Sequence, residues 1–250
     1  MKVSDIFSLI NGMAPIETAL SFDNSGILLG DPDGKVTKAV VTLDATFAAV
    51  SYAKEIGAEL IITHHPIIFS PLKSIVKQSG NIVYECLSNG IAVISMHTNL
   101  DVANGGVNDC LANALELQNI TTLTDEEGFS FKKGELKNEM SADELALFVK
   151  ERLGGNVRYT DGKKAIKTVC VCGGSGGSEL SIAMNNADAF VTADIKHNLF
   201  IEADAKEFSL FDAGHFHTEN VVIASLAESL NNKAEGTSFF AFNGKEIKTV

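Results

Sequence analysis

The chain of 250 residues is 45% hydrophobic and 21% charged, which is an ordinary globular balance and argues against a disordered protein. Asp and Glu outnumber Lys and Arg by 32 to 20, so the formal net charge is -12, and no basic run is long enough to follow a phosphate backbone; we therefore expect no stable binding to nucleic acid. The N-terminus lacks the apolar segment of a signal peptide and no stretch reaches the roughly 20 apolar residues of a spanning helix, which predicts a cytoplasmic protein without a membrane segment.

The first half of the chain alternates apolar strands with amphipathic helices. Strands are predicted at residues 36–45, 58–65 and 91–97, and helices at 47–57, 81–90 and 105–117. Near-continuous apolar strands separated by helices are typical of a parallel sheet that is covered on both faces. The first half is therefore predicted to be an α/β domain.

A polar, charged and weakly periodic segment at residues 121–140 is the predicted boundary, which divides the chain into domains 1–125 and 126–250. Beyond it, Ser141 and Glu144 form a predicted capping box at the start of a helix. Further strands are predicted at 165–174, 188–193, 208–214 and 238–244, with helices at 178–187, 197–206 and 218–230. The chain is thus predicted to hold two three-layer α/β halves with largely parallel sheets.

The four cysteines are few for this length and include no CxxC pair. Cys170 and Cys172 alternate within an apolar run, so their side chains should share one face of a strand. We expect all four to be reduced residues of the core, namely Cys86, Cys110, Cys170 and Cys172.

Histidines and an acid follow two predicted strands of the first half. His64 and His65 end the strand at 58–65, and His97 and Asp101 come at the end of the next strand and just beyond it. The carboxyl ends of parallel strands meet at one edge of a sheet, where α/β proteins bind their ligands. We therefore expect these side chains to lie at a common edge.

The second half offers two more residues of this kind. The strand at 208–214 leads into His215, and Glu219 follows four residues later, in the first turn of the predicted helix. Imidazole nitrogens and carboxylate oxygens are ligands that zinc, iron and manganese accept. The whole set exceeds the ligands of one tetrahedral ion, whereas two ions about 3.5 to 4 Å apart, bridged by a carboxylate, would use all of it.

Each of these residues also has a simpler interpretation. Adjacent histidines such as His64 and His65 are often solvated side chains of a surface loop. Glu219 could stabilise a helix dipole by about 0.3 to 1 kcal/mol without any metal. His97 could be a partly buried histidine that hydrogen-bonds to the backbone, and His217 is expected to face solvent or a neighbouring subunit.

The segment CVCGGSGGSEL at residues 170–180 places glycines and serines between a strand and a helix. It lacks the GK[ST] ending of a phosphate loop, and a dinucleotide motif read from Gly174 would need glycine where Glu179 stands. The segment is predicted to be a tight turn. Anion binding at the start of the following helix is the alternative.

Five motifs make the chain similar to a known family. They are SFDNSGILLGDP (21–32), VTLDAT (41–46), IITHHPIIF (61–69), HTNLDVANGGVND (97–109) and GHFHTEN (214–220). These motifs resemble those of the NIF3-like family, whose members are often labelled GTP cyclohydrolase 1 type 2 homologs or DUF34 proteins, and the resemblance covers nearly the whole chain. Phe22 stands where the family commonly has Trp, a change that concerns packing because an aromatic ring is kept.

The resemblance implies a site for two divalent ions per chain, built from both α/β halves. Its metal ligands would be His64, His65, Asp101, His215 and Glu219. Glu219 would bridge the ions, and His97 would lie close to them as a catalytic residue that transfers protons. The resemblance also implies a ring-shaped homohexamer.

Two classes of function remain open at this point. The first is a metal-dependent hydrolase of a small substrate, such as a nucleotide or another phosphate-bearing metabolite, since a divalent ion lowers the pKa of bound water toward about 7. The family label suggests GTP ring opening. The second is a metal-binding chaperone, store or regulatory interaction protein without catalysis, which a closed coordination shell would favour.

Overall fold

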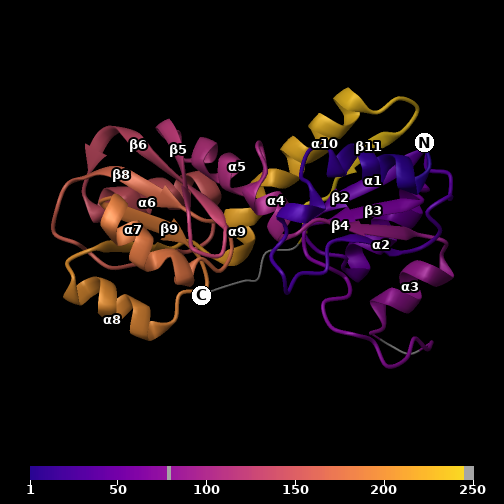
Figure 1. The fold of residues 1–250 in the computed structure, drawn as a ribbon, viewed down its shortest axis with the longest axis horizontal. Helices are drawn as coiled ribbons and strands as arrows, with labels where there is room; N and C mark the ends of the chain where they lie inside the picture. Colours follow the sequence, from indigo (N-terminus) through magenta and orange to yellow (C-terminus); the bar gives the residue numbers. More distant parts are fainter. Residues whose placement is uncertain (78–79, 245–250) are drawn as a thin grey trace. The chain divides into compact units, whose positions relative to one another are not determined.

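The computed structural model describes residues 1–77 and 80–244 and contains two α/β units, each built on its own sheet (Figure 1). The first unit comprises Met1–Asn104 together with the chain from Ile223 through the last strand, and the second comprises Gly105–Val222. The predicted α/β class with two sheets is therefore confirmed.

The first sheet is mainly parallel. Its strands are β1 (Gly26–Leu29), β2 (Lys38–Thr42), β3 (Leu60–Thr63), β4 (Ala92–Ser95) and β11 (Ser238–Ala241), in the order β1-β4-β3-β2-β11. Only β1 runs antiparallel to its neighbour within this sheet. Thr42, Thr63 and Ser95 are aligned across β2, β3 and β4, so these three strands end level with one another. The segments that follow them therefore leave from one edge.

Two helices, α2 (Phe47–Ile56) and α3 (Ile82–Ser88), cover one face of the first sheet. α2 begins at Thr46, whose side chain accepts the backbone N–H of Ala49, and it ends at Gly57 as predicted. Gly57 has φ 69°, a left-handed conformation that glycine adopts without a steric penalty.

The interior of this unit is built from alternate strand residues. Val40, Ile61 and Val93 pack in one buried cluster with side chains of α2 and α3. In Figure 1, α1 (Val3–Asn11) and α10 (Val221–Lys233) lie on the other side of the sheet. The sheet is thus the middle of three layers.

The second sheet is mixed. Its strands are β5 (Gln118–Thr124), β6 (Ser130–Met140), β7 (Arg158–Tyr159), β8 (Ile166–Val171), β9 (Ala189–Thr192) and β10 (Ser209–Asp212), in the order β5-β6-β8-β9-β10-β7. β8, β9 and β10 are parallel, whereas β5, β6 and β7 pair antiparallel. The central parallel strands again send their carboxyl ends to one edge.

Helices cover both faces of this second sheet. They are α5 (Val107–Ala114), α6 (Ala142–Leu153), α7 (Leu180–Asn186) and α8 (His197–Ala205). Val169 and Val171 of β8 pack with α5 and α6, while Cys170 and the following Cys172 pack with α7 and α8. The alternation along β8 thus separates two hydrophobic layers.

The predicted capping box is present at the start of α6, where Ser141 and Glu144 each accept a backbone N–H of the other. The predicted burial of cysteines is confirmed at Cys170 and Cys172 but is wrong for Cys110, which is only half-buried. Burial raises the pKa of the Cys170 thiol to about 12. Cys86 is also buried as predicted, in the core of the first unit.

The polar segment at 121–140 is not an irregular connection: it includes most of the β5–β6 hairpin, and Phe131 of β6 is fully buried. The chain passes from the first unit to the second after residue 104 and returns to the first after residue 222. The sequence instead predicts a single boundary between residues 125 and 126. The difference has a physical cause. β6 pairs with β8 in the second sheet, and β11 returns to pair with β2 in the first.

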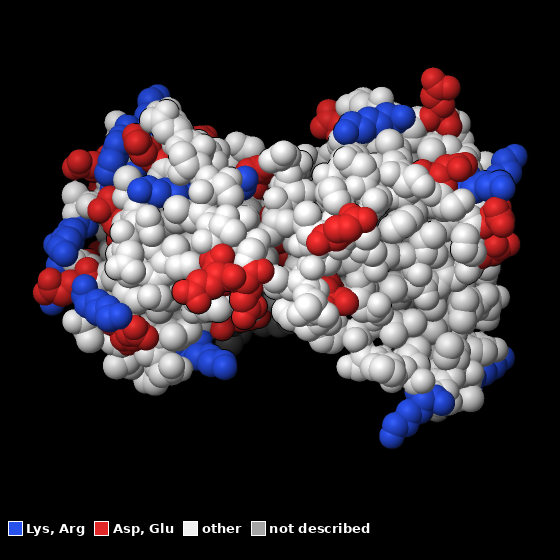
Figure 2. Space-filling model, in the orientation of Figure 1, with Lys and Arg blue, Asp and Glu red and all other residues white. Residues whose placement is uncertain are grey.

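Charged side chains of both signs are dispersed over the surface. On the face that Figure 2 shows, lysines and arginines lie among aspartates and glutamates rather than in one stripe. Within residues 1–77 and 80–244, every helix is too short or too polar to cross a lipid bilayer. The expected lack of nucleic-acid binding stays a prediction.

Candidate metal centre

Three histidines come together at the carboxyl edge of the first sheet. His64 and His65 directly follow β3, and His97 lies two residues beyond β4. The ring centroids of His64 and His65 are 5.0 Å apart, and those of His64 and His97 are 5.4 Å apart. One ring nitrogen from each of the three lies within 4.8 Å of the others, close enough to share an ion. We call these residues the imidazole cluster.

The first member of the imidazole cluster has a defined tautomer. Nδ1 of His64 lies 2.9 Å from the backbone carbonyl oxygen of Met96. A carbonyl oxygen only accepts hydrogen bonds, so Nδ1 must carry the proton and Nε2 keeps the lone pair in the neutral ring. His64 is buried, at 1% exposure, which excludes the interpretation of a solvated loop side chain. Nε2 is therefore the ring nitrogen of His64 that could bind a metal.

Carboxylates hold the other two members. Nδ1 of His65 lies 2.8 Å from an Asp44 carboxylate oxygen, and Nδ1 of His97 lies 2.9 Å from one of Asp23. Burial opposes the charge of Asp23, but hydrogen bonds from His97 and Thr98 outweigh it and hold the pKa of this carboxyl well below its usual range. Both imidazoles are therefore oriented through Nδ1, as metal-binding histidines commonly are.

A carboxylate completes this edge of the first unit. Asp101 lies in α4 (Thr98–Val102), a short helix that starts directly after His97. It is buried, and its Oδ1 is 3.4 Å from Nε2 of His64. The predicted grouping of His64, His65, His97 and Asp101 at one edge is thus present in the first unit.

The second unit brings His215 and Glu219 together on a single helical turn, α9 (His215–Glu219). Nε2 of His215 lies 3.0 Å from Oε2 of Glu219, and its Nδ1 lies 2.7 Å from an Asp194 carboxylate oxygen. Burial alone would lower the pKa of His215, but the hydrogen bonds and charges of Glu219 and Asp194 raise it to about 9.

The predicted helix position of Glu219 is wrong. Glu219 is the last residue of α9, and the long helix α10 starts only at Val221. A carboxylate at the last residue of α9 gains nothing from the dipole of that helix. The dipole of α9 therefore does not explain why this nearly fully buried carboxylate is there.

The glycine loop between β8 and α7 packs directly on this pair. Gly174 has φ 63°, and a Cβ atom at this position would overlap Oε1 of Glu219 and approach Cε1 of His215 to 3.3 Å. Its backbone N–H donates to Oγ1 of Thr218 at 3.0 Å. The predicted turn is present, and only a residue without a side chain allows it to approach Glu219 so closely.

Buried polar side chains hold this loop in place. Asn108 accepts the N–H of Gly173 at 2.8 Å and donates to the Ser130 carbonyl. The Thr192 hydroxyl donates to the carbonyl of Gly174 and accepts the N–H of Gly176. The loop is therefore held rigidly in place where it packs against His215 and Glu219.

His217 is predicted to face solvent or a neighbouring subunit, and the structure does not bear out the first alternative; the second stays a prediction. His217 is half-buried, and its Nδ1 donates at 3.1 Å to the carbonyl oxygen of Leu153, the last residue of α6. A Cβ on Gly155 would overlap its ring. His217 therefore helps to close the end of a helix and does not join His215.

Three carboxylates that orient the histidines were not found from the sequence: Asp23, Asp44 and Asp194. Asp44 comes two residues after β2, and Asp194 comes two residues after β9. The rule that points to the histidines, polar residues just beyond parallel strands, would have pointed to these two acids as well. Asp23 precedes β1 and carries no such signal.

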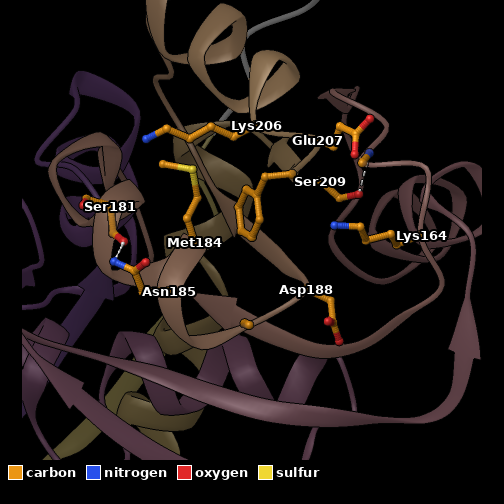
Figure 3. A pocket seen from close by; sticks show the side chains of 11 residues that line it. Lys164, Ser181, Met184, Asn185, Asp188, Lys206, Glu207 and Ser209 are labelled. Carbon is orange, nitrogen blue, oxygen red and sulfur yellow. Dashed lines mark hydrogen bonds between the residues drawn. The ribbon is translucent and has the colours of Figure 1, made fainter.

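A cavity of about 330 Å³ lies elsewhere in the second unit, at the opposite edge of its sheet (Figure 3). Its lining includes Asp188 before β9 and Lys206 to Ser209 around the start of β10. Figure 3 shows Lys164 and Lys206 on two sides of this hollow, and Asp188 and Glu207 offset their charge. It shares no residue with the candidate metal ligands, and we assign it no function.

The fold and these clusters define a class: α/β proteins with His, Asp and Glu gathered beyond parallel strands, in groups that could bind metal. Comparison with known proteins identifies the family. The family model described as Duf34/NIF3 (NGG1p interacting factor 3) matches residues 1–246. The chain therefore belongs to the Duf34/NIF3 family.

Individual relatives extend over nearly the whole chain. A Campylobacter jejuni protein is 36% identical over 93% of this chain and 93% of its own, and a Clostridium perfringens protein is 32% identical over 99% and 98%. Both carry the name GTP cyclohydrolase 1 type 2 homolog. A crystal structure of a Staphylococcus aureus protein is similar with a TM-score of 0.91 and 29% identity, covering 100% of this chain and 99% of that one.

Proposed function

We propose that this protein binds two divalent metal ions and uses them to hydrolyse a small substrate. The proposed metal ligands are His64, His65, Asp101, His215 and Glu219, with Glu219 as the bridging carboxylate. The ions would be zinc, iron or manganese, because imidazole nitrogens and carboxylates suit all three.

One observation carries the proposal. Each of the four histidines that would lie at the metals has Nδ1 held by an oxygen acceptor: Met96, Asp44, Asp23 and Asp194 supply the acceptors. Histidines that bind metal almost always donate their second ring N–H in this way, which fixes the tautomer and turns the other nitrogen toward the ion. His217 also has its Nδ1 held by a backbone carbonyl, but for three of the four histidines at the proposed metals the acceptor is a carboxylate, which makes the imidazole a better ligand.

Bound divalent ions would supply Lewis-acid activation of water and of the attacked group. The chain itself would then orient its ligands through the carboxylates and move protons. His97 is suited to proton transfer because its Nδ1 is fixed to the ionised Asp23, which leaves Nε2 to exchange a proton with a reacting group. We assign His97 this catalytic role.

The substrate class that this site suits is a small nucleotide or another phosphate-bearing metabolite, in keeping with the name that the relatives carry. We further propose that the protein works in the cytoplasm as a homohexamer, as the family resemblance implies. Light scattering on the purified protein tests the hexamer directly.

Metal analysis tests the proposal most sharply. Protein reconstituted with zinc, manganese or iron and then desalted should carry about two ions per chain. Glu219→Ala should lose bound metal, whereas His97→Ala should keep it and lose turnover on a panel of nucleotides and phosphoesters. A wild-type protein without metal after reconstitution would refute the site, and metal-loaded protein without turnover on any substrate would leave a non-catalytic metal-binding protein.

A further inference from the structure

Two exposed aromatic rings extend the surface of the imidazole cluster. Phe22 is 60% exposed and Phe69 is 56% exposed, although both are large apolar side chains. Their ring centroids are 6.4 Å apart, and the Phe69 ring is 6.3 Å from that of His97, nearly perpendicular to it. We call Phe22 and Phe69 the aromatic shelf.

Hydrogen bonds of residues next to both rings hold the shelf in place, and one of them also orients His97. Asp23, the neighbour of Phe22, binds the ring of His97 and accepts both the N–H and the hydroxyl of Thr98. The side-chain amide of Asn24 donates to the carbonyl of Ile68, which precedes Phe69. Both rings therefore sit on backbone that is tied down, so their exposure is not the consequence of a loose loop.

We infer that the aromatic shelf binds a planar heteroaromatic ring of the substrate, of the nucleobase type, by stacking next to His97. Fixed aromatic rings open to solvent pay little conformational entropy on binding and attract the flat face of another ring. The imidazole of His97 lies against Phe69, so a ring on the shelf would have its substituents beside the proposed proton-transfer residue. The inference rests on the proposed function, because it names the kind of substrate on which that site would act.

The sequence makes a clean experiment possible, because the chain contains no tryptophan. Phe22→Trp keeps an aromatic side chain and introduces a single indole reporter on the shelf. Phe240→Trp, at a partly exposed position on β11 of the same unit, is the matched control. Guanosine, adenosine and GTP are the probes, and ribose 5-phosphate and inorganic triphosphate carry the sugar and phosphates without a ring.

The expected result is saturable quenching of the indole at position 22 by the ring-bearing probes only, with no saturable change at position 240. Adding Phe69→Leu to Phe22→Trp should raise the dissociation constant roughly 5- to 150-fold, the loss expected for one base–aromatic stack. Leucine keeps an apolar side chain, so this change removes the ring and not the hydrophobic surface.

Three results would overturn the inference. They are no saturable quenching by any ring-bearing probe, equal quenching at positions 22 and 240, and emission that depends on protein concentration without a probe, which would mean that a second copy of the chain covers the shelf. Each titration is repeated with a chelator and with metal, and metal content is measured on the same samples. Quenching without metal binding would refute the proposed function alone, and metal binding without quenching would refute the shelf alone.

Discussion

The two units hold their candidate ligands by different means. In the first, Asp44 and Asp23 fix imidazoles that stand on separate segments beyond β3 and β4. In the second, one turn of helix carries both His215 and Glu219, and the backbone of Gly174 presses against the carboxylate.

This difference predicts which substitutions each unit tolerates without losing the arrangement of its candidate ligands. An arrangement made of side-chain hydrogen bonds loses one constraint at a time when a partner is changed. An arrangement defined by backbone contact fails when any atom is added at the contact, because the interior is closely packed and cannot absorb it. Changes to glycine in the second unit should therefore do more damage than changes to the acids of the first.

The largest effect is expected for Gly174→Ala. The new methyl group would displace Glu219, and with it the proposed bridging ligand, so metal affinity should fall by more than the roughly 10- to 100-fold that loss of a group behind a ligand causes. Isothermal titration with zinc or manganese measures this. Gly57→Ala is the matched control, because Gly57 has a similar φ of 69° but open space around its Cβ position.

Both substitutions place a side chain in a left-handed conformation, which should cost about 1 to 2 kcal/mol of unfolding free energy. The overlap with Glu219 should cost Gly174→Ala about 1 to 3 kcal/mol more. Only Gly174→Ala should lose metal. Equal metal affinity in the two variants would mean that the glycine loop does not position Glu219, and the contrast between the units would disappear.

A smaller loss is expected when an orienting acid is neutralised. Asp44→Asn keeps the size of the side chain but removes the charge that holds the ring of His65, so metal affinity should fall roughly 10- to 100-fold. Asp194→Asn should act similarly through His215. Asp33→Asn, at an exposed surface ion pair with Lys2, should leave metal affinity unchanged.

Metal titration of these three variants tests whether the carboxylates of Asp44 and Asp194 orient their histidines for metal binding. If Asp44→Asn and Asp194→Asn bind metal as Asp33→Asn does, the hydrogen bonds to Nδ1 have no role in ligand orientation. A loss confined to Asp194→Asn would reverse the comparison, because it would show that side-chain bonds matter in the second unit and not in the first.

Local patterns were enough to predict much of this arrangement. The strands that lead to His64, His97 and His215 are apolar runs, and the end of a parallel strand is a place that sequence order alone identifies. The pairing of His65 with Asp44 was not predictable in the same way, because the rule gives the edge of the sheet and not which groups meet there.

Other features depend on distant contacts. The long strand β6 (Ser130–Met140) was missed because its composition is polar, although burial of Phe131 and pairing with β8 stabilise it. The last strand, β11, was predicted as a strand but placed in the wrong half, since nothing in its own residues tells which sheet it joins. The break between α9 and α10 after Glu219 has no proline or glycine to mark it, so the sequence predicts one continuous helix there.

The smallest effect concerns Glu179, which follows the glycine loop and is buried with its Oε2 accepting from the Ser178 hydroxyl at 2.9 Å. Burial raises the pKa of this carboxyl, and the nearby charges of Asp125 and Glu127 add to the rise. The folded state therefore binds this proton more tightly than the unfolded state, so ionisation lowers stability as the pH rises from the ordinary glutamate value through the raised one.

Glu179→Gln removes that cost while keeping the shape and the bond from Ser178. The variant should melt at a slightly higher temperature than the wild type at pH 7 and at nearly the same temperature at pH 3, where the wild-type carboxyl is protonated in both states. Its metal affinity should not change, because the loop acts on Glu219 through backbone atoms of Gly174. A lower melting temperature at pH 7, or a loss of metal, would mean that the Glu179 carboxylate itself supports the second unit, and the claim that the loop acts on Glu219 through the backbone of Gly174 would fail.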